Sequence, residues 1–196
     1  QSHFSTLQVR ILWPCFSKNG WAFPDNGLSL GRKPILGLPD LLETIVIERF
    51  VSLVNFAFMP NHIHLTVHIK EESGLSRYMQ KVLNAYTKYF NQKHGLSGHL
   101  FQGPFGAVHV QDNDQLLHLS AYIHKNPIAL KEWMNKLDEY PWSSLTDDVH
   151  ENRWGDLLQP SIVLDQFKGG HDYKGFIKES VAKEFLEDSQ LFDNDL

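Results

Sequence analysis

The sequence predicts an α+β fold: a ferredoxin-like antiparallel sheet of the split βαβ type with helices on one face, followed by a helical C-terminal extension. Two observations lead to this prediction. Apolar or alternating segments and helical segments follow one another in the order strand, helix, strand, strand, helix, strand, and then a further helix. A tight turn at Pro60-Asn61 joins two of the strands, which indicates an antiparallel hairpin.

The first third of the chain supplies three strands and one short helix. Residues 5–13 alternate loosely and predict a strand, whereas residues 14–37 are rich in Pro, Gly and Asn and predict a long loop. Pro39-Asp40 opens a short helix that we expect to end near Arg49. Residues 51–59 are almost wholly apolar and predict a buried strand, and residues 62–69 alternate strictly and predict its hairpin partner.

The longest predicted helix spans residues 74–93, because apolar side chains recur there at helical spacing and His94-Gly95 supplies a stop. Residues 105–111 predict a short strand. A further helix is expected over residues 114–125, with Asp112 or Asn113 as its cap and Asn126-Pro127 at its end.

We expect two parts, a catalytic domain over residues 1–130 and a helical extension over residues 131–196 that packs on it. The extension is predicted to contain a turn at 140–142, an apolar segment at 162–167 and a helix at about 174–187.

The composition is that of a globular protein, with 42% hydrophobic and 21% charged residues among 196. The one cysteine excludes a disulfide framework or a Cys-rich zinc site within one chain. No apolar run approaches the roughly 18 residues of a membrane span, and no signal peptide is visible. We therefore expect a cytoplasmic protein that does not bind membranes.

The formal net charge of −5 argues against a nucleic-acid partner until it is divided by position. Residues 1–130 carry a net charge of +3, residues 131–196 carry −8, and no acidic residue lies between Ser73 and Gln111. The cations of that acid-free stretch fit either a solvated helix face or a strip that faces phosphates.

The sequence His62-Ile63-His64 carries the strongest local signal for chemistry. Alternate residues of a strand share a face, so His62 and His64 lie about 6.6 Å apart on the same face, where both imidazoles can reach one ion. Ile63 points to the other face, towards the helices. A pair of surface histidines on a half-exposed strand is the plain alternative.

A second signal lies on the helix before Pro127. His118, Tyr122 and Asn126 are spaced by four residues and so form one line along that helix. The hydroxyl of Tyr122 and the amide of Asn126 could lie beside an ion held by the two histidines. Simple amphipathic packing of the tyrosine is again the alternative.

Together these residues carry a resemblance to a known family. Residues 58–65, Phe-Met-Pro-Asn-His-Ile-His-Leu, resemble the signature of the HUH (His-hydrophobic-His) single-tyrosine transposases, which are IS200-like, and more narrowly of the REP-associated tyrosine transposases. Other stretches match in the expected order: 86–91, 98–103, 122–127, 140–144 and 162–177. The resemblance covers about residues 31 to 187.

The resemblance implies a transposase for DNA transposition and recombination that binds Mg²⁺ or Mn²⁺ and cuts single-stranded DNA beside a hairpin. His62, His64 and Asn126 would be the metal ligands, and imidazole favours Mn²⁺ over Mg²⁺. Tyr122 would be the nucleophile and become joined to the 5′ phosphate, leaving a free 3′ hydroxyl. A cation near the phenol favours the reactive phenolate, since free tyrosine has a pKa of about 10.

The expected DNA contacts are Arg77, Lys81, Lys88, Lys93, His99, Gln102 and His124. The family usually has basic residues at two positions where this chain has Pro104 and Gly106, which keeps a non-catalytic binder of structured single strands as an alternative. A third hypothesis is an unrelated metal-dependent hydrolase that uses His62, His64 and His118. The sequence leaves open whether the protein is a monomer or a homodimer.

Overall fold

The protein is represented by a computed structural model that describes residues 6–12, 49–101 and 103–181. Four antiparallel strands form one sheet in the order β2-β3-β1-β4. They are β1 (Thr6–Leu12), β2 (Val51–Phe58), β3 (His62–Ile69) and β4 (Gly106–His109). With α2 (Gly74–His94) between β3 and β4, this order is the split βαβ arrangement, and the predicted ferredoxin-like α+β fold is confirmed.

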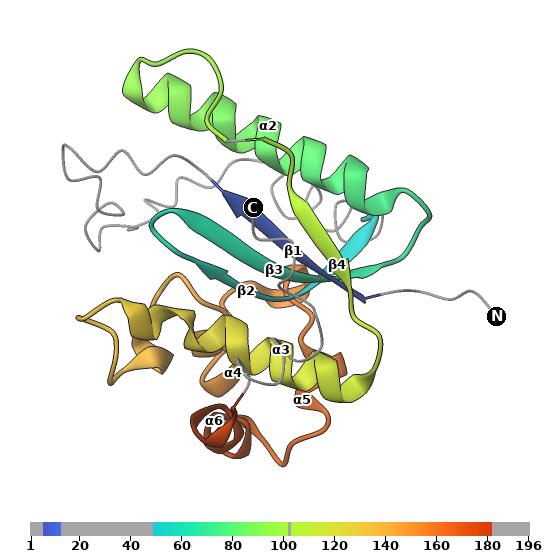
Figure 1. The fold of residues 1–196 in the computed structure, drawn as a ribbon, viewed down its shortest axis with the longest axis vertical. Coiled ribbons are helices and arrows are strands. Elements are labelled where there is room, and N and C mark those ends of the chain that lie inside the picture. Colours follow the sequence, from blue (N-terminus) through green and yellow to red (C-terminus); the bar gives the residue numbers. More distant parts are fainter. Residues whose placement is uncertain (1–5, 13–48, 102, 182–196) are drawn as a thin grey trace.

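The prediction that helices cover only one face is wrong, because the sheet lies between two layers of helices (Figure 1). The helix α2 of the βαβ unit covers one face, while α3 (Asn113–Lys125) and the extension cover the other. The extension contributes α4 (Leu145–Val149), α5 (Ser161–Leu164) and α6 (Gly170–Glu179), with short 3-10 turns between them. The predicted loop 14–37 and most of the predicted helix that precedes β2 lie outside the described residues.

The strict alternation in β3 divides the core into two clusters. Ile63, Leu65 and Val67 point towards α2 and pack with Leu75 and Met79 of that helix. On the other face, α3 and the extension pack against β2 in a second cluster of buried side chains, which includes Val54, Ala57, Leu119, Ile123, Leu145 and Tyr173. The period-2 pattern therefore places the histidines of β3 on the α3 side of the sheet.

The predicted start of α3 and the predicted end of α2 are both confirmed. Asp112 caps α3, because its Oδ1 accepts a hydrogen bond of 2.8 Å from the backbone N–H of Gln115. Gly95 ends α2 in the left-handed region with φ of 63°, and its N–H donates to the carbonyl of Asn91. The observed helix ends differ from the predicted ones by one residue at most.

Residues 140–144 do more than form the predicted turn. Ser143 forms an antiparallel bridge with Ala57. The backbone N–H of Phe58 donates to the carbonyl of Trp142 at 2.9 Å. The backbone N–H of Ser144 donates to the carbonyl of Phe56 at 3.0 Å. This pairing covers the free edge of β2, which would otherwise expose unpaired backbone groups. It also holds the extension on the strand that neighbours the histidines.

The predicted bounds of the last helix, 174–187, are wrong for the described residues. Helix α6 starts at Gly170 because its backbone lies directly on the end of α4, where a Cβ would approach the carbonyl oxygen of Asp148 to 2.7 Å. It ends at Glu179, since Ser180 adopts extended backbone angles. The turn that begins at Gly170 carries Tyr173, which is fully buried.

Candidate active site

The strand β3 and the end of helix α3 bring four side chains together. The rings of His62 and His64 stand edge to face, with centroids 4.8 Å apart. The ring of Tyr122, on α3, stands edge to face with His64 at 5.5 Å. Asn126 follows at the C-cap of α3, and its Oδ1 lies 3.5 Å from Nε2 of His62.

Local hydrogen bonds fix the direction in which His62 and Asn126 present their acceptor atoms. Nδ1 of His62 lies 2.7 Å from the amide oxygen of Asn61, so this nitrogen donates and Nε2 keeps its lone pair. The amide nitrogen of Asn126 donates to the carbonyl of Tyr122 at 2.9 Å, which directs Oδ1 of Asn126 towards His62. A lone pair and an amide oxygen thus face one another across a short gap.

His64 is the most constrained of the four residues, with 1% of its surface exposed. Burial, followed by the positive charges of His62 and Arg10, lowers the pKa of His64 to about 3, although the nearby amide of Asn126 acts in the opposite direction. The ring is therefore neutral at physiological pH, which is the form that binds metal ions. Among the described residues, the amide of Asn126 lies near the ring, but no group forms a well-aligned hydrogen bond with either ring nitrogen.

A divalent metal ion fits this donor set. A buried imidazole without hydrogen bonds is costly unless another group binds it, and a cation between His62, His64 and Asn126 would satisfy it. Two neutral imidazoles and one amide oxygen leave positions for water or phosphate oxygens, unlike a closed structural zinc site. Among the described residues no group of three His, Cys, Asp or Glu side chains is placed to hold a metal, so the amide is essential to this candidate.

The alternative of two surface histidines on a half-exposed strand is wrong for His64. His64 and Thr66 are 1% and 0% exposed, because α3 packs over this face of the sheet. Tyr122 lies half-buried against His64, and Ile123 and Leu119 beside it are fully buried. The polar residues of β3 therefore lie beneath a helix rather than at a free surface.

The hydrolase hypothesis that adds His118 does not fit the structure. Nδ1 of His118 lies 3.2 Å from the hydroxyl of Ser180, and its ring contacts Phe176 of α6. Its position two turns before Asn126 directs it to the extension rather than to His62 and His64.

The expected DNA contacts fall into separate groups. Arg77 forms an ion pair of 3.2 Å with Glu71 and lies over the ring of Phe50, which Lys81 also contacts. Lys88, Lys93 and His99 are exposed at the far end of α2 and in the loop after it. All five lie on or beyond α2, on the other side of the sheet from His64. Gln102 lies outside the described residues.

A phosphate contact by His124 is not compatible with its environment, because this side chain is completely buried. Its Nδ1 lies 2.8 Å from the hydroxyl of Tyr173, and its Nε2 lies 2.8 Å from that of Ser144. Burial lowers the pKa of His124 to about 3, so the ring is neutral. His124 is therefore a structural residue on the back of the helix that carries Tyr122.

The buried polar network to which His124 belongs was not predicted from the sequence. The hydroxyl of Tyr173 on α6 is shared between Ser120 and His124 of α3, and the hydroxyl of Ser144 accepts from the backbone N–H of Phe56 at 2.9 Å. These bonds join α3 and α6 to β2, the strand that pairs with the histidine strand. Because the partners are far apart in the sequence, no local spacing indicates the network.

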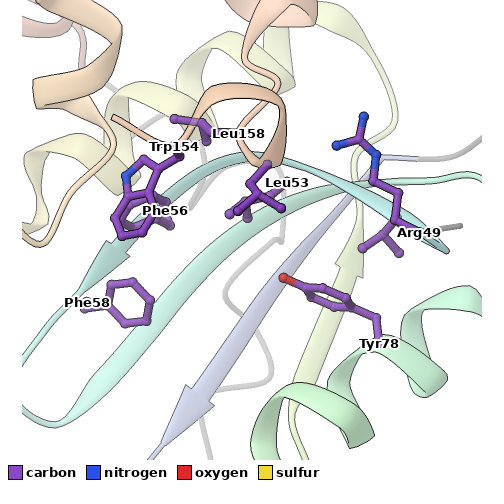
Figure 2. A pocket seen from close by; sticks show the side chains of 9 residues that line it. Arg49, Leu53, Phe56, Phe58, Tyr78, Trp154 and Leu158 are labelled. Atoms are coloured by element: carbon purple, nitrogen blue, oxygen red, sulfur yellow. The ribbon is translucent and has the colours of Figure 1, made fainter. Parts of the chain in front are cut away.

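A hollow of about 280 Å³ lies on the α2 side of β2 (Figure 2). Aromatic and aliphatic side chains from β2, α2 and the segment 154–158 surround it, with Arg49 at one end: Arg49, Val51, Leu53, Phe56, Phe58, Tyr78, Trp154, Leu157 and Leu158. The described lining holds no imidazole or carboxylate.

The fold and the site together define a class: a ferredoxin-like sheet in which a His-x-His strand faces a tyrosine on the following helix. Residues 36–126 match the family model described as "Transposase IS200 like", a range that includes His62, His64, Tyr122 and Asn126. The match confirms the resemblance to the IS200-like transposases over this segment.

Among solved structures, the chain is similar to "Structure of the REP associates tyrosine transposase bound to a REP hairpin". The two share 19% identity and a TM-score of 0.46, over 74% of this chain and 79% of the other. No curated protein matches the chain. No helix in the described part of the chain is long and apolar enough to cross a membrane.

Proposed function

We propose that the protein is a metal-dependent transposase or nuclease that cleaves and rejoins single-stranded DNA beside a hairpin through a 5′-phosphotyrosine intermediate. One observation carries the proposal: His64 is buried and neutral, forms no well-aligned hydrogen bond with any described residue and stands against Tyr122. The match of residues 36–126 to the IS200-like transposases supports it. The hairpin substrate follows from the same resemblance.

In this proposal His62, His64 and Asn126 hold Mg²⁺ or Mn²⁺, and bound metal supplies positive charge to a non-bridging oxygen of the phosphate to be cut. The imidazoles are suited to this role because both can present neutral nitrogens. Asn61 orients the ring of His62, and the carbonyl of Tyr122 orients the amide of Asn126. Such outer contacts fix the ligand atoms before the ion arrives.

Tyr122 acts as the nucleophile. Its phenol oxygen loses a proton to water and attacks the phosphorus; the bond from phosphorus to the 3′ oxygen breaks, and that oxygen leaves as a hydroxyl after taking a proton. The bond energy is kept in the phosphotyrosine, so rejoining needs no ATP. In the reverse direction a 3′ hydroxyl attacks the phosphotyrosine, the new phosphodiester forms and the phenol is restored.

The residues 1–130 form the catalytic domain in this proposal, and the extension supports it from behind α3. We assign the protein to the cytoplasm, where single-stranded DNA is available, and leave it as a monomer or a homodimer. The uncharged Pro104 and exposed Gly106 favour a second candidate, a transposase-derived protein that binds structured single strands without cutting them.

A denaturing gel distinguishes the two candidates. The protein is incubated with Mn²⁺ and hairpin DNA that carries a label on either the 5′ or the 3′ side of the cleavage point. We expect a denaturant-stable adduct with the fragment 3′ of the cut, no adduct in EDTA, and none with Tyr122→Phe. Tyr89→Phe, an exposed tyrosine on α2, is the matched control and should form the adduct normally.

Hairpin binding without any adduct in the wild-type protein would favour the second candidate. An adduct that survives in Tyr122→Phe would overturn the assignment of the nucleophile. Release of cut DNA without an adduct would instead indicate a hydrolase.

A further inference from the structure

The last turns of α2 carry only exposed or partly exposed side chains. The helix has 21 residues, about 31 Å in length, whereas the eight residues of β3 span about 26 Å. It starts after the end of β3 and runs back along the sheet, so its C-terminal turns lie towards the end of the sheet at which β3 begins (Figure 1). Its buried residues are Gly74, Leu75 and Met79, all in the first two turns.

The C-terminal end of α2 carries aromatic side chains at its surface. Tyr89 and Tyr86 are 57% and 40% exposed, and their ring centroids lie 6.4 Å apart. Tyr86 also contacts Phe90 at 6.2 Å and Phe101, from the following loop, at 6.1 Å. These four residues, the α2 aromatic cluster, hold the loop 95–101 on one side and offer tyrosine ring faces to solvent on the other.

The surroundings of the cluster are cationic. Lys88 and Lys93 are exposed within the same turns of the helix, and the ammonium group of Lys93 lies 3.3 Å from the hydroxyl of Tyr89. No acidic residue occurs between Ser73 and Gln111, so neither the helix end nor its loop brings a negative charge of its own. Rings that can stack and cations that attract phosphate are the two elements of a sequence-tolerant site for single-stranded nucleic acid.

We propose that the α2 aromatic cluster with Lys88 and Lys93 binds the unpaired DNA strand that extends from the hairpin, with bases stacked on Tyr89 and Tyr86. The inference rests on the proposed function for the identity of the DNA and adds where its single strand lies. The last turns of α2 and the start of β3, at His62, lie towards the same end of the sheet, so one strand can pass from the catalytic site to α2. A second copy of the chain fits less well, because a symmetric contact would bring the lysines of the two copies together.

The test measures equilibrium binding in EDTA, which separates binding from cleavage. The full chain is titrated with a fluorescent blunt hairpin and with the same hairpin carrying a ten-nucleotide single-stranded extension. Stacking contributes about 1–3 kcal/mol per base, so Tyr89→Ala should weaken binding of the extended hairpin by about fivefold or more. Binding of the blunt hairpin should change less than about twofold.

Two control variants separate stacking from loss of apolar surface. Tyr89→Phe keeps the ring and should retain the affinity of the wild type. Leu96→Ala removes exposed apolar surface from the same end of the helix without removing a ring, and should change neither affinity. Lys88→Gln and Lys93→Gln should each reduce the salt slope for the extended hairpin by about 0.7.

An unchanged affinity of Tyr89→Ala for the extended hairpin would overturn the inference, as would an equal loss for both hairpins. Sedimentation of the free protein is the further check: if Tyr89→Ala converts a dimer into a monomer, the cluster is an interface between copies and the inference is wrong. Failure of the proposed function looks different, since the adduct would then be absent while the dependence on Tyr89 persists.

Discussion

The ring of Tyr122 stands edge to face with the ring of His64, with centroids 5.5 Å apart and planes at 82°. The ring of Tyr122 comes from α3 and the ring of His64 from β3. The contact places a phenol against a buried, neutral imidazole whose nitrogens form no hydrogen bonds. Such an arrangement weakens the folded protein locally and has a clear purpose only if a further group binds there.

His64→Leu should therefore separate stability from function. The substitution removes two buried nitrogens without partners and keeps a side chain of similar bulk, so the free energy of unfolding in EDTA should rise by about 1 kcal/mol. The same variant should form no adduct with hairpin DNA in Mn²⁺. Urea denaturation and the adduct gel provide the two measurements. A strong loss of stability in EDTA would show that His64 has stabilising partners and is part of the structure alone.

Asn126→Ala should act on metal affinity. The amide oxygen faces Nε2 of His62 at 3.5 Å, and its loss leaves two imidazole ligands. We expect the Mn²⁺ concentration for half-maximal adduct formation to rise about tenfold or more, with part of the rate recovered at high Mn²⁺. Asn113→Ala, at the opposite end of α3, is the matched control. An unchanged Mn²⁺ titration with a lower maximal rate would assign Asn126 to the placement of Tyr122 instead.

The buried network behind α3 predicts a stability effect for Tyr173→Phe. The lost hydroxyl leaves Ser120 and His124 with unsatisfied polar groups in a fully buried position, which should lower the free energy of unfolding by about 1–3 kcal/mol. Tyr78→Phe is the control, because its hydroxyl faces the hollow beside β2 (Figure 2) and should matter by less than about 0.5 kcal/mol. Equal losses in urea denaturation would contradict the importance of the network.

Asp148, beside the same network, predicts a pH dependence. Burial and the neighbouring Asp147 raise the pKa of Asp148 to about 8, above its ordinary value of 3.8. The folded state therefore holds a proton that the unfolded state loses, so this contribution to stability is complete below about pH 4 and lost as the pH rises towards 8. Asp148→Asn should reduce the fall in unfolding free energy between pH 5 and pH 8 by an amount on the order of 1 kcal/mol. An unchanged fall would contradict the buried, protonated carboxyl.

The sequence was a good guide wherever the signal was local. The strict alternation of β3 and the Pro60-Asn61 turn predicted the hairpin, and the stop at Gly95 and the cap at Asp112 predicted the ends of α2 and α3. The pairing of the two histidines on one face also followed from the period of a strand. These features depend on backbone geometry within a few residues, which composition and spacing reveal directly.

Features that depend on distant contacts were missed. The sequence did not predict the burial of His64, because the covering of one sheet face by α3 depends on tertiary packing. It treated His124 as a possible phosphate contact, although its partner Tyr173 belongs to the extension. In both cases the neighbour that decides burial lies far away in the chain.

The most direct test of the central claim is the anomalous difference map of crystals soaked in Mn²⁺. We predict one strong peak between the imidazoles of His62 and His64 and Oδ1 of Asn126, with Mn²⁺ within about 2.4 Å of each ligand atom. The peak should disappear in crystals of His64→Leu. A well-ordered site without such a peak in the wild-type protein, or a peak that binds other residues, would contradict the metal-dependent cleavage centre proposed for these residues.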